Sequence, residues 1–361
     1  MSATILLTGG AGFVGSHTYV ALKEAGYQVV IVDDFSNAAR DIPDRLAQIT
    51  GGQVLAYDVD ISDVDALDAV FRAHRFDAVI HFAAKKSLRQ SLANPQAFFS
   101  ANIRSLLSLM QVMEQHRVSA IVYSSSATVY GVPEALPIPE HAPLSYTSPY
   151  GLSKLIGEQF LNQKASAEQG WATGILRYFN PAGAHPSGII GEAPLSDGGN
   201  LMPLVARVAK GQLPSLSVFG QDYGTPDGTG IRDYIHVCDL AQGHVLSVNR
   251  LLRRGASHTV NLGNGRGYSV LDLIKTYEKV SGQVIRYRFK PRREGDVAAS
   301  FADSAMAASV LGFRAERNLL EMCQSSWRYE TMNDPNWHPK DAVPAGFTAP
   351  LSTSHTMQLP H

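Results

Sequence analysis

The chain of 361 residues has few cysteines, no charge imbalance and no long apolar run. Its two cysteines, Cys238 and Cys323, lie far apart without metal-ligand spacing, which excludes a disulfide framework and a cysteine-based zinc site. The 31 basic and 32 acidic residues leave a formal net charge of -1, which gives no field to recruit nucleic acid or an anionic membrane. No stretch approaches the roughly 20 apolar residues of a membrane span.

The two chain ends are equally uninformative about targeting. Residues 1–8 run directly into a strand-like apolar stretch and lack the basic and apolar regions of a signal peptide. Residues 339–361 are rich in Pro, Ser, Thr and His and are predicted to form a flexible tail. The 45% hydrophobic content is that of a globular protein. From the two isolated cysteines we expect a reducing cytoplasm, and from the balanced charge a small-molecule partner.

Short β-branched runs alternate with helical patterns through the first half of the chain. The runs cover residues 4–8, 28–33, 53–57, 78–82, 120–124 and 173–178. Segments such as 16–26 and 95–117 are long enough for crossover helices. This alternation predicts an α/β fold with a doubly wound parallel sheet, a Rossmann domain, over 1–180.

After residue 180 the alternation of strands and helices gives way to segments rich in Pro and Gly, at 181–200 and 219–232, which are predicted to be loops. Long loops of this kind favour a smaller α/β substrate-binding domain, here expected mainly over 181–338. Part of 234–265 is a candidate to join the first domain, because either the strand-like 260–262 or the helical 269–281 is expected to return near its sheet.

Three glycines at three-residue intervals, Gly9, Gly12 and Gly15, link the first predicted strand to the first helix. Gly9 permits a tight turn, Gly12 lets the backbone approach a pyrophosphate, and Gly15 allows close helix-to-strand packing. The alternative is a loop that merely needs a positive φ. The place of the glycine turn between a predicted strand and a predicted helix favours dinucleotide binding.

The second predicted strand ends in Asp33 and Asp34. A carboxylate there accepts hydrogen bonds from the adenosine ribose and repels a 2′-phosphate, so the sequence predicts NAD rather than NADP. A solvated strand end or a helix cap is the alternative. The position favours Asp33 and leaves Asp34 ambiguous.

Tyr150 and Lys154 are spaced Tyr-x-x-x-Lys, which places both side chains on one face of a helix. A lysine ammonium beside a phenol lowers the tyrosine pKa from about 10 toward a range where the phenolate accepts a proton at neutral pH. The pair therefore predicts a general base. Each residue alone is more often a core aromatic or a solvated lysine.

The order of the glycine turn, the serine-rich segment 124–131 and the Tyr150/Lys154 pair resembles the extended short-chain dehydrogenase/reductase family, and within it the UDP-glucose 4-epimerases. Further matching segments bring the resemblance to about residues 4–330, at 81–86, 177–186, 200–203, 228–237 and 291–296. It implies that Tyr150 removes the proton of the sugar 4-hydroxyl while the C4 hydride passes to bound NAD. The 4-keto sugar then rotates to present its opposite face. The hydride and the proton return to that face, which inverts the configuration at C4.

The resemblance also implies residue roles. Ser126 hydrogen-bonds the reacting oxygen and completes the catalytic set with Tyr150 and Lys154, although the serine run 124–126 could instead cap a strand. The implied cofactor residues are Gly9, Gly12, Phe13, Val14, Gly15, Asp33, Asp34, Phe35, Ser36, Asn37, Asp60, Ile61, Phe82, Ala83, Ala84, Lys86, Asn102, Ser126, Tyr150, Lys154 and Phe179. The implied substrate residues are Ser126, Tyr150, Asn180, Asn200, Leu201, Ser217, Val218, Phe219, Arg232, Arg293, Asp296 and Ser300.

Among the substrate residues, Arg232 and Arg293 suit a bidentate grip on a diphosphate. Phe219 is expected near the uracil and Asp296 at the uridine ribose, with ordinary packing or capping as the alternatives. Ser300 falls where some relatives place a bulky tyrosine. Its small side chain motivates the hypothesis that UDP-N-acetylhexosamines are accepted as well as UDP-glucose and UDP-galactose.

Rival functions differ at defined positions. A nucleotide-sugar 4,6-dehydratase calls for an Asp-Glu pair where this chain has Ala127 and Thr128, and a non-catalytic NAD-sensing protein is expected to have a broken Ser/Tyr/Lys set. No His-Glu-x-x-His or similar spacing appears, so no metal is expected. Helices near 95–117 and 148–169 resemble those through which relatives form a homodimer by a four-helix bundle.

Overall fold

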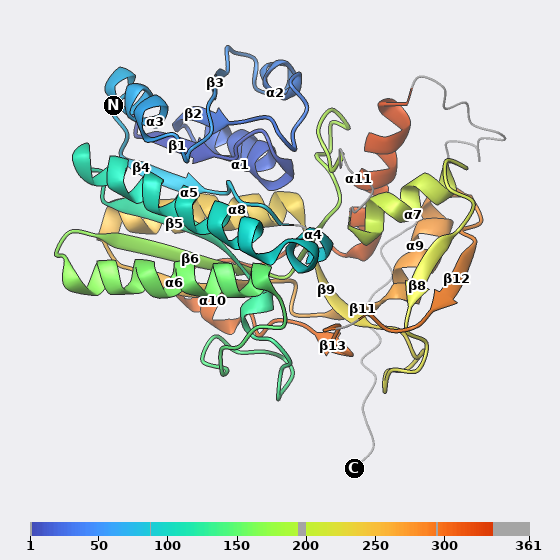
Figure 1. Cartoon of the computed structure of the whole chain (residues 1–361). Coiled ribbons are helices and arrows are strands. Elements are labelled where there is room, and N and C mark those ends of the chain that lie inside the picture. The colour runs from blue at the N-terminus through green and yellow to red at the C-terminus, as the bar shows by residue number, and fades with distance from the viewer. Residues whose placement is uncertain (1, 87, 194–199, 294, 335–361) are drawn as a thin grey trace.

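The computed structural model describes residues 2–86, 88–193, 200–293 and 295–334, and a seven-stranded sheet forms its centre (Figure 1). All neighbouring strands of this sheet are parallel. In spatial order they are β10 (His258–Leu262), β6 (Ala172–Tyr178), β5 (Ala120–Ser126), β4 (Ala78–His81), β1 (Thr4–Thr8), β2 (Gln28–Asp33) and β3 (Leu55–Asp58). The predicted doubly wound parallel sheet is thus confirmed.

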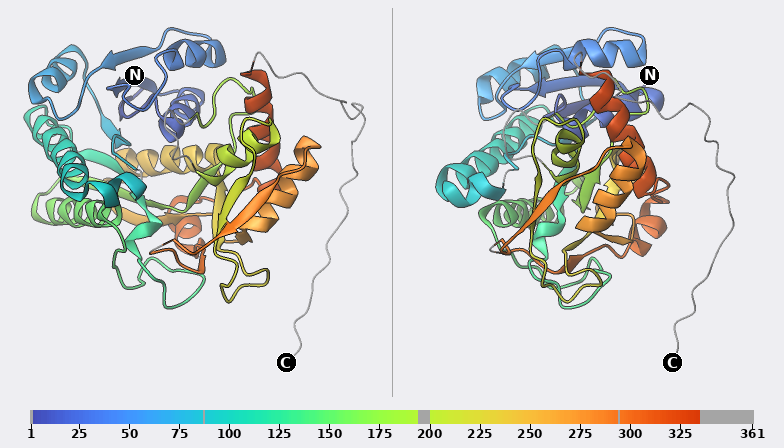
Figure 2. Two further views of the ribbon diagram at one scale, coloured as in Figure 1. Left: turned by 45° about the vertical axis from the view of Figure 1, so that its right-hand side comes forward. Right: turned by 90° about the vertical axis from the view of Figure 1, so that its right-hand side faces the viewer.

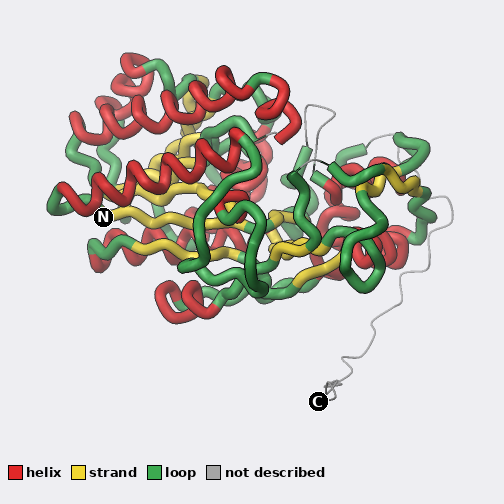
Figure 3. The backbone as a smooth tube through the Cα atoms, turned by 60° about the horizontal axis from the view of Figure 1, so that its bottom comes forward, coloured by secondary structure: helices red, strands yellow, loops and turns green. Residues whose placement is uncertain are grey.

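Helices cover both faces of this sheet, and Figure 3 shows the strands lying between helical layers. One face packs against α1 (Phe13–Glu24), α2 (Ile42–Thr50), α8 (Val237–Arg254) and α10 (Ala305–Leu311). The other packs against α3 (Val64–Ala73), α5 (Pro95–Gln115) and α6 (Pro149–Ala167). The short helix α4 (Leu88–Ala93) precedes α5, and the single 3-10 turn η1 (Ala127–Val129) follows β5.

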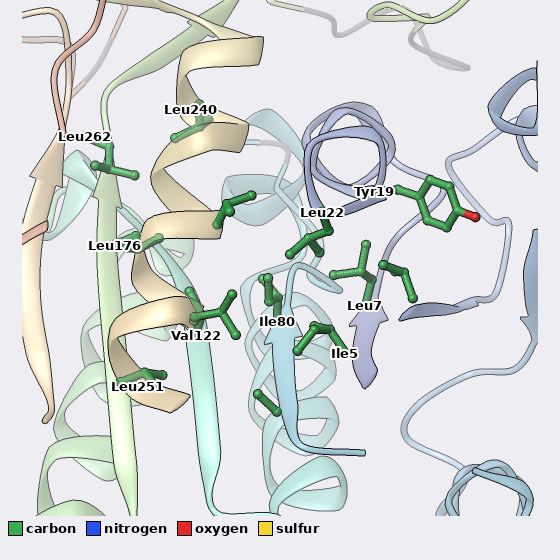
Figure 4. Close-up of a cluster of buried hydrophobic side chains, with 14 of the residues drawn as sticks. Ile5, Leu7, Tyr19, Leu22, Ile80, Val122, Leu176, Leu240, Leu251 and Leu262 are labelled. Atoms are coloured by element: carbon green, nitrogen blue, oxygen red, sulfur yellow. The ribbon is translucent and has the colours of Figure 1, made fainter. Parts of the chain in front are cut away.

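Alternation along the buried strands supplies both cores. Ile5 and Leu7 join the core under α1 and α8, whereas Leu6 between them joins the core under α3 and α5. A strand buried on both faces has to be apolar at every position, which explains the continuous apolar runs. Figure 4 shows the first of these cores, where Leu22 and Leu240 face the strand residues Leu7, Ile80, Val122 and Leu176.

The later part of the chain forms a group of its own beside the main sheet (Figure 2). Its mixed sheet contains β7 (Asn180–Ala182), β9 (Ile231–His236), β11 (Gly267–Ser269) and β13 (Ala299–Ser300), and β8 (Leu216–Phe219) pairs with β12 (Tyr287–Lys290). A separate apolar core joins β7, β8, β9 and β11 to α7 (Leu201–Ala209), α9 (Val270–Ser281) and α11 (Leu319–Met332).

The chain crosses back between the two groups once α8 begins. After β9, α8 packs on α1 and β10 pairs with β6, so residues 237–262 belong to the main sheet and its helical layer. The predicted domain limits 1–180 and 181–338 stay predictions, and the predicted tail 339–361 lies outside the described residues. In the described part of the chain, no helix combines the length and the apolar character needed to span a membrane.

Candidate active site

The predicted cofactor residues follow the carboxyl ends of neighbouring parallel strands. Because these strands point the same way, the loops after β1, β2, β3, β4 and β5 meet along one edge of the sheet, where ligands of doubly wound folds bind. These strand ends and the segments that follow them carry residues 9–15, 33–37, 60–61, 82–86 and Ser126.

The glycine turn has the geometry of a phosphate cradle. Gly9 has φ of 70°, and a Cβ there would lie 2.7 Å from the backbone nitrogen of Ala83. A Cβ on Gly15 would collide with the carbonyl oxygen of Gly9. Gly12 caps α1 without a side-chain hydrogen bond, so first-turn N–H groups of this 12-residue helix are available to an anion. These features fit the pyrophosphate of a dinucleotide.

Asp33 is a buried carboxylate tied to the glycine turn. It accepts the N–H of Ala11 at 2.9 Å and the N–H of Phe35 at 2.9 Å. Burial raises the pKa of Asp33, and the two backbone hydrogen bonds oppose that rise. The neighbouring Asp34 instead accepts the N–H and hydroxyl of Ser36, at 2.9 and 2.6 Å. The two aspartates therefore differ, since only Asp33 fixes the turn.

The segment after β4 closes onto the same turn. The N–H groups of Phe82 and Ala83 both donate to the carbonyl of Thr8, at 2.9 and 3.1 Å. Asn102 of α5 accepts the N–H of Lys85 at 2.8 Å and donates to the Ser153 hydroxyl at 3.1 Å. The buried Asn102 amide thus fastens this segment to α6.

Ser126, Tyr150 and Lys154 come together where β5 ends and α6 begins. Ser126 is the last residue of β5 and accepts the N–H of Thr128 at 3.2 Å. The Lys154 ammonium donates to the carbonyl of Ser124 at 2.6 Å and lies 5.9 Å from the centre of the Tyr150 ring. The three side chains therefore lie close together at the start of α6.

The predicted lowering of the Tyr150 pKa is wrong for this structure. Loss of water raises the pKa of Tyr150 to about 12, although a hydrogen bond with Ser126 lowers it in part. Burial lowers the pKa of Lys154 to about 7, although the charge of Glu158 raises it in part. Burial thus shifts both groups toward their neutral forms, and the lysine directs its hydrogen bond to Ser124.

Apart from Ser126 and Tyr150, the predicted substrate residues belong to the second group of elements. Asn180 is in β7, Asn200 caps α7, Leu201 opens α7, and Ser217, Val218 and Phe219 are in β8. Arg232 of β9 pairs with the Asp296 carboxylate at 2.5 Å. The Arg293 guanidinium lies 3.9 Å over the centre of the Phe219 ring. Ser300 of β13 is the register partner of Arg232.

Arg232 already faces a carboxylate, so its positive charge alone does not indicate a bound anion. The segment around Arg293 and Asp296 nevertheless lies near the start of α6. A Cβ on Gly295 would lie 3.5 Å from the carbonyl oxygen of Thr147, three residues before Tyr150. Gly295, beside the predicted substrate residue Asp296, therefore lies close to the start of the helix that carries Tyr150.

A family model described as the NAD dependent epimerase/dehydratase family matches residues 5–263. The chain belongs to this family. A UDP-glucose 4-epimerase of Bacillus subtilis is 50% identical over 329 residues, which is 91% of this chain and 97% of that protein.

Two solved structures show the likeness in three dimensions. The UDP-glucose 4-epimerase of Bifidobacterium longum in complex with NAD+ and UDP has a TM-score of 0.89 at 47% identity, covering 92% of this chain and 99% of that one. The enzyme of Stenotrophomonas maltophila, with bound NAD and formylated UDP-arabinopyranose, has a TM-score of 0.89 at 44% identity and covers 91% and 98%. The NAD cofactor of this epimerase/dehydratase family agrees with the cradle described above.

Two functional candidates in this family member were missed by the sequence reasoning. Glu158, one helical turn after Lys154, accepts hydrogen bonds from Arg177 Nε at 3.0 Å and Nη2 at 2.7 Å, and from the Ser125 hydroxyl. Arg177 Nη1 donates to the Tyr130 hydroxyl at 3.0 Å. The sequence held two signals for this pair: Glu158 lies on the same helical face as Lys154, and Arg177 lies inside an otherwise apolar strand. The network holds Ser125, and hence Ser126, in place.

Proposed function

We propose that the protein is a UDP-glucose/UDP-galactose 4-epimerase, an NAD-dependent isomerase. The observation that carries this proposal is the convergence of Ser126, Tyr150 and Lys154 beside a dinucleotide cradle. Identities of 45–50% to proteins named UDP-glucose 4-epimerase, over 91–92% of the chain, support the same substrate class.

The catalytic residues move one proton in each direction. Tyr150 takes the proton of the sugar 4-hydroxyl, Ser126 hydrogen-bonds the same oxygen, and Tyr150 later returns the proton on the opposite face of the sugar. When bound, NAD supplies a reversible hydride acceptor for C4. A phenol with a pKa of about 12 resists this step by several kcal/mol at neutral pH. The hydrogen bond with Ser126 lowers this pKa in part, and Lys154 favours the phenolate in its protonated form.

The remaining site residues keep the roles implied by resemblance as parts of this proposal. The turn 9–15 holds the pyrophosphate, Asp33 reads the adenosine ribose, and Lys154 also reaches the nicotinamide ribose. Arg232 and Arg293 grip the substrate diphosphate, which requires Arg232 to exchange its contact with Asp296 for the ligand. Asp296 then becomes available to the uridine ribose.

The test is incubation of the purified protein with UDP-galactose without added NAD, followed by separation of the nucleotide sugars. We expect UDP-glucose to accumulate to a fixed equilibrium ratio. A 4-keto-6-deoxy sugar product would instead indicate a dehydratase, although Ala127 and Thr128 provide no carboxylate for that chemistry. No conversion without added NAD, together with NADH formed in proportion to substrate once NAD is added, would indicate a simple dehydrogenase.

We further propose that UDP-N-acetylhexosamines are substrates, because Ser300 presents a small, partly buried side chain at the register position of Arg232. Conversion of UDP-GlcNAc to UDP-GalNAc is the assay. Ser300→Tyr should abolish this conversion while keeping turnover of UDP-galactose, since only the wider C2 substituent needs the space. No detectable UDP-GalNAc from the wild type would refute the hypothesis.

We also propose a homodimer through α5 and α6. Leu107 of α5 is 46% exposed and Phe160 of α6 is 37% exposed, and the two helices lie against each other. Paired helices with exposed apolar side chains suit a four-helix bundle between two copies. A monomer in sedimentation would contradict this. A cytoplasmic location stays a prediction from the sequence.

A further inference from the structure

Glu192 is a buried carboxylate that lies between the proposed cofactor side and the proposed substrate side. Its Oε1 accepts a hydrogen bond from Asn200 Nδ2 at 2.7 Å and lies 3.5 Å from Lys86 Nζ. Lys86 follows β4 on the cofactor side, and Asn200 caps α7 on the substrate side. Only 9% of Glu192 is exposed. A single oxygen atom therefore contacts one group from each side.

The chain before Glu192 is fastened to its surroundings. The carbonyl of Pro186 accepts from Arg328 of α11 at 2.8 Å, and the carbonyl of Ile189 accepts from Arg45 of α2 at 3.1 Å. A Cβ on Gly191 would lie 2.5 Å from the Tyr329 ring, so backbone packs directly on this ring. The backbone that leads to Glu192 is consequently held by α2 and α11, outside both ligand sides, whereas its carboxylate is held by Asn200 and Lys86.

The charges around Glu192 make it dependent on its two contacts. Burial raises the pKa of its carboxyl, and Lys86 followed by Asn200 opposes that rise. Glu330 adds repulsion, although its own carboxylate pairs with Lys210 at 2.7 Å. Because the Asn200 amide nitrogen donates to Glu192, its Oδ1 is directed to other partners. A ligand that reorients either contact also disturbs the other.

We propose that Glu192 is a positioning residue that couples the cofactor side of the site to its UDP-sugar side, an inference that rests on the proposed function. A ligand that orders Asn200 fixes Glu192, and the shared oxygen then fixes Lys86. Ordering of one side in advance reduces the entropy that the other ligand has to lose, so each ligand binds more tightly when the other is present.

The experiment compares wild-type holoenzyme with Glu192→Ala and Glu192→Gln. The rate of NAD loss on dilution is measured with and without saturating UDP, and kcat and KM are measured for UDP-galactose. Glu192→Ala removes both contacts, whereas Glu192→Gln keeps an oxygen acceptor for Asn200 and removes the charge that faces Lys86. Glu114→Gln is the matched control, because Glu114 pairs with Lys164 at the far ends of α5 and α6.

We expect UDP to slow NAD loss from the wild type and from Glu114→Gln. In Glu192→Ala the slowing should vanish and KM should rise roughly tenfold to a hundredfold, the size of one lost hydrogen bond to a charged group, with kcat within about twofold. Glu192→Gln should lose the slowing with KM within about threefold. This near-isosteric variant decides the matter if Glu192→Ala fails to fold.

Three results would overturn the coupling. They are wild-type behaviour of both variants, a fall in kcat at unchanged KM, and NAD loss from the wild type that UDP does not affect. A wild type that holds NAD but does not convert UDP-galactose would contradict the proposed function instead. The two failures are therefore distinguishable.

Discussion

Replacement of Glu158 by alanine should be among the most damaging single changes in the chain. The Glu158 and Arg177 side chains are 1% and 5% exposed, and the glutamate accepts bonds from two guanidinium nitrogens and from Ser125. The variant leaves the Arg177 charge buried with only neutral acceptors, the Tyr130 hydroxyl and the Glu140 carbonyl. Removal of one partner from such a buried pair costs about 3–5 kcal/mol in unfolding free energy.

Urea unfolding followed by circular dichroism, at equal NAD saturation, measures this cost. Glu158→Leu/Arg177→Met should recover part of the loss, because an apolar pair leaves no unpaired charge. Glu114→Ala is the control, since Glu114 is 48% exposed and its ion pair should contribute under about 1 kcal/mol. A loss below about 1 kcal/mol in Glu158→Ala would refute the reasoning that the network is a buried, interdependent unit.

Three further variants test the catalytic residues. Tyr150→Phe should keep its NAD content and lose about 10² to 10⁴ in kcat, measured by product separation, because only proton transfer is removed. Ser126→Ala should slow turnover and move the rising limb of the kcat pH profile to higher pH, since the hydrogen bond with Ser126 lowers the pKa of the base Tyr150; an unmoved limb would contradict this. Lys154 has a pKa of about 7 when folded against 10.5 for the free group, so between these values the unfolded chain holds the extra proton. Unfolding free energy should therefore rise with pH by up to about 1 kcal/mol per unit relative to Lys154→Met, in urea titrations at pH 7.5 and 8.5.

The sheet was predictable because its signals are local. A buried parallel strand is apolar along its length. Glycines mark positions where the backbone has a positive φ or where there is no space for a Cβ, as at Gly9 and Gly15. Strand ends were less predictable. The run 120–124 was predicted as a strand, but β5 continues to Ser126. Ser126 pairs with Tyr178 of β6, and a local pattern does not reveal this pairing. α8 was not predicted as an element, although part of its region was expected near the first sheet.

The electrostatics of the site depended on contacts that spacing does not encode. The helical period placed Tyr150 and Lys154 together, but the burial that sets their pKa values comes from the surrounding fold. Glu192 meets Lys86 across 106 residues of sequence. Such long-range polar contacts are fixed by tertiary packing, so the sequence suggested the types of residue present and not their partners.

The most direct test of C4 epimerisation uses UDP-galactose that carries deuterium at C4. Because the same hydrogen leaves and returns as hydride within one site, the UDP-glucose product should retain the deuterium at C4. The reaction should proceed with only the NAD that copurifies with the protein. Product that contains solvent hydrogen at C4, or a requirement for NAD in proportion to substrate, would contradict the account.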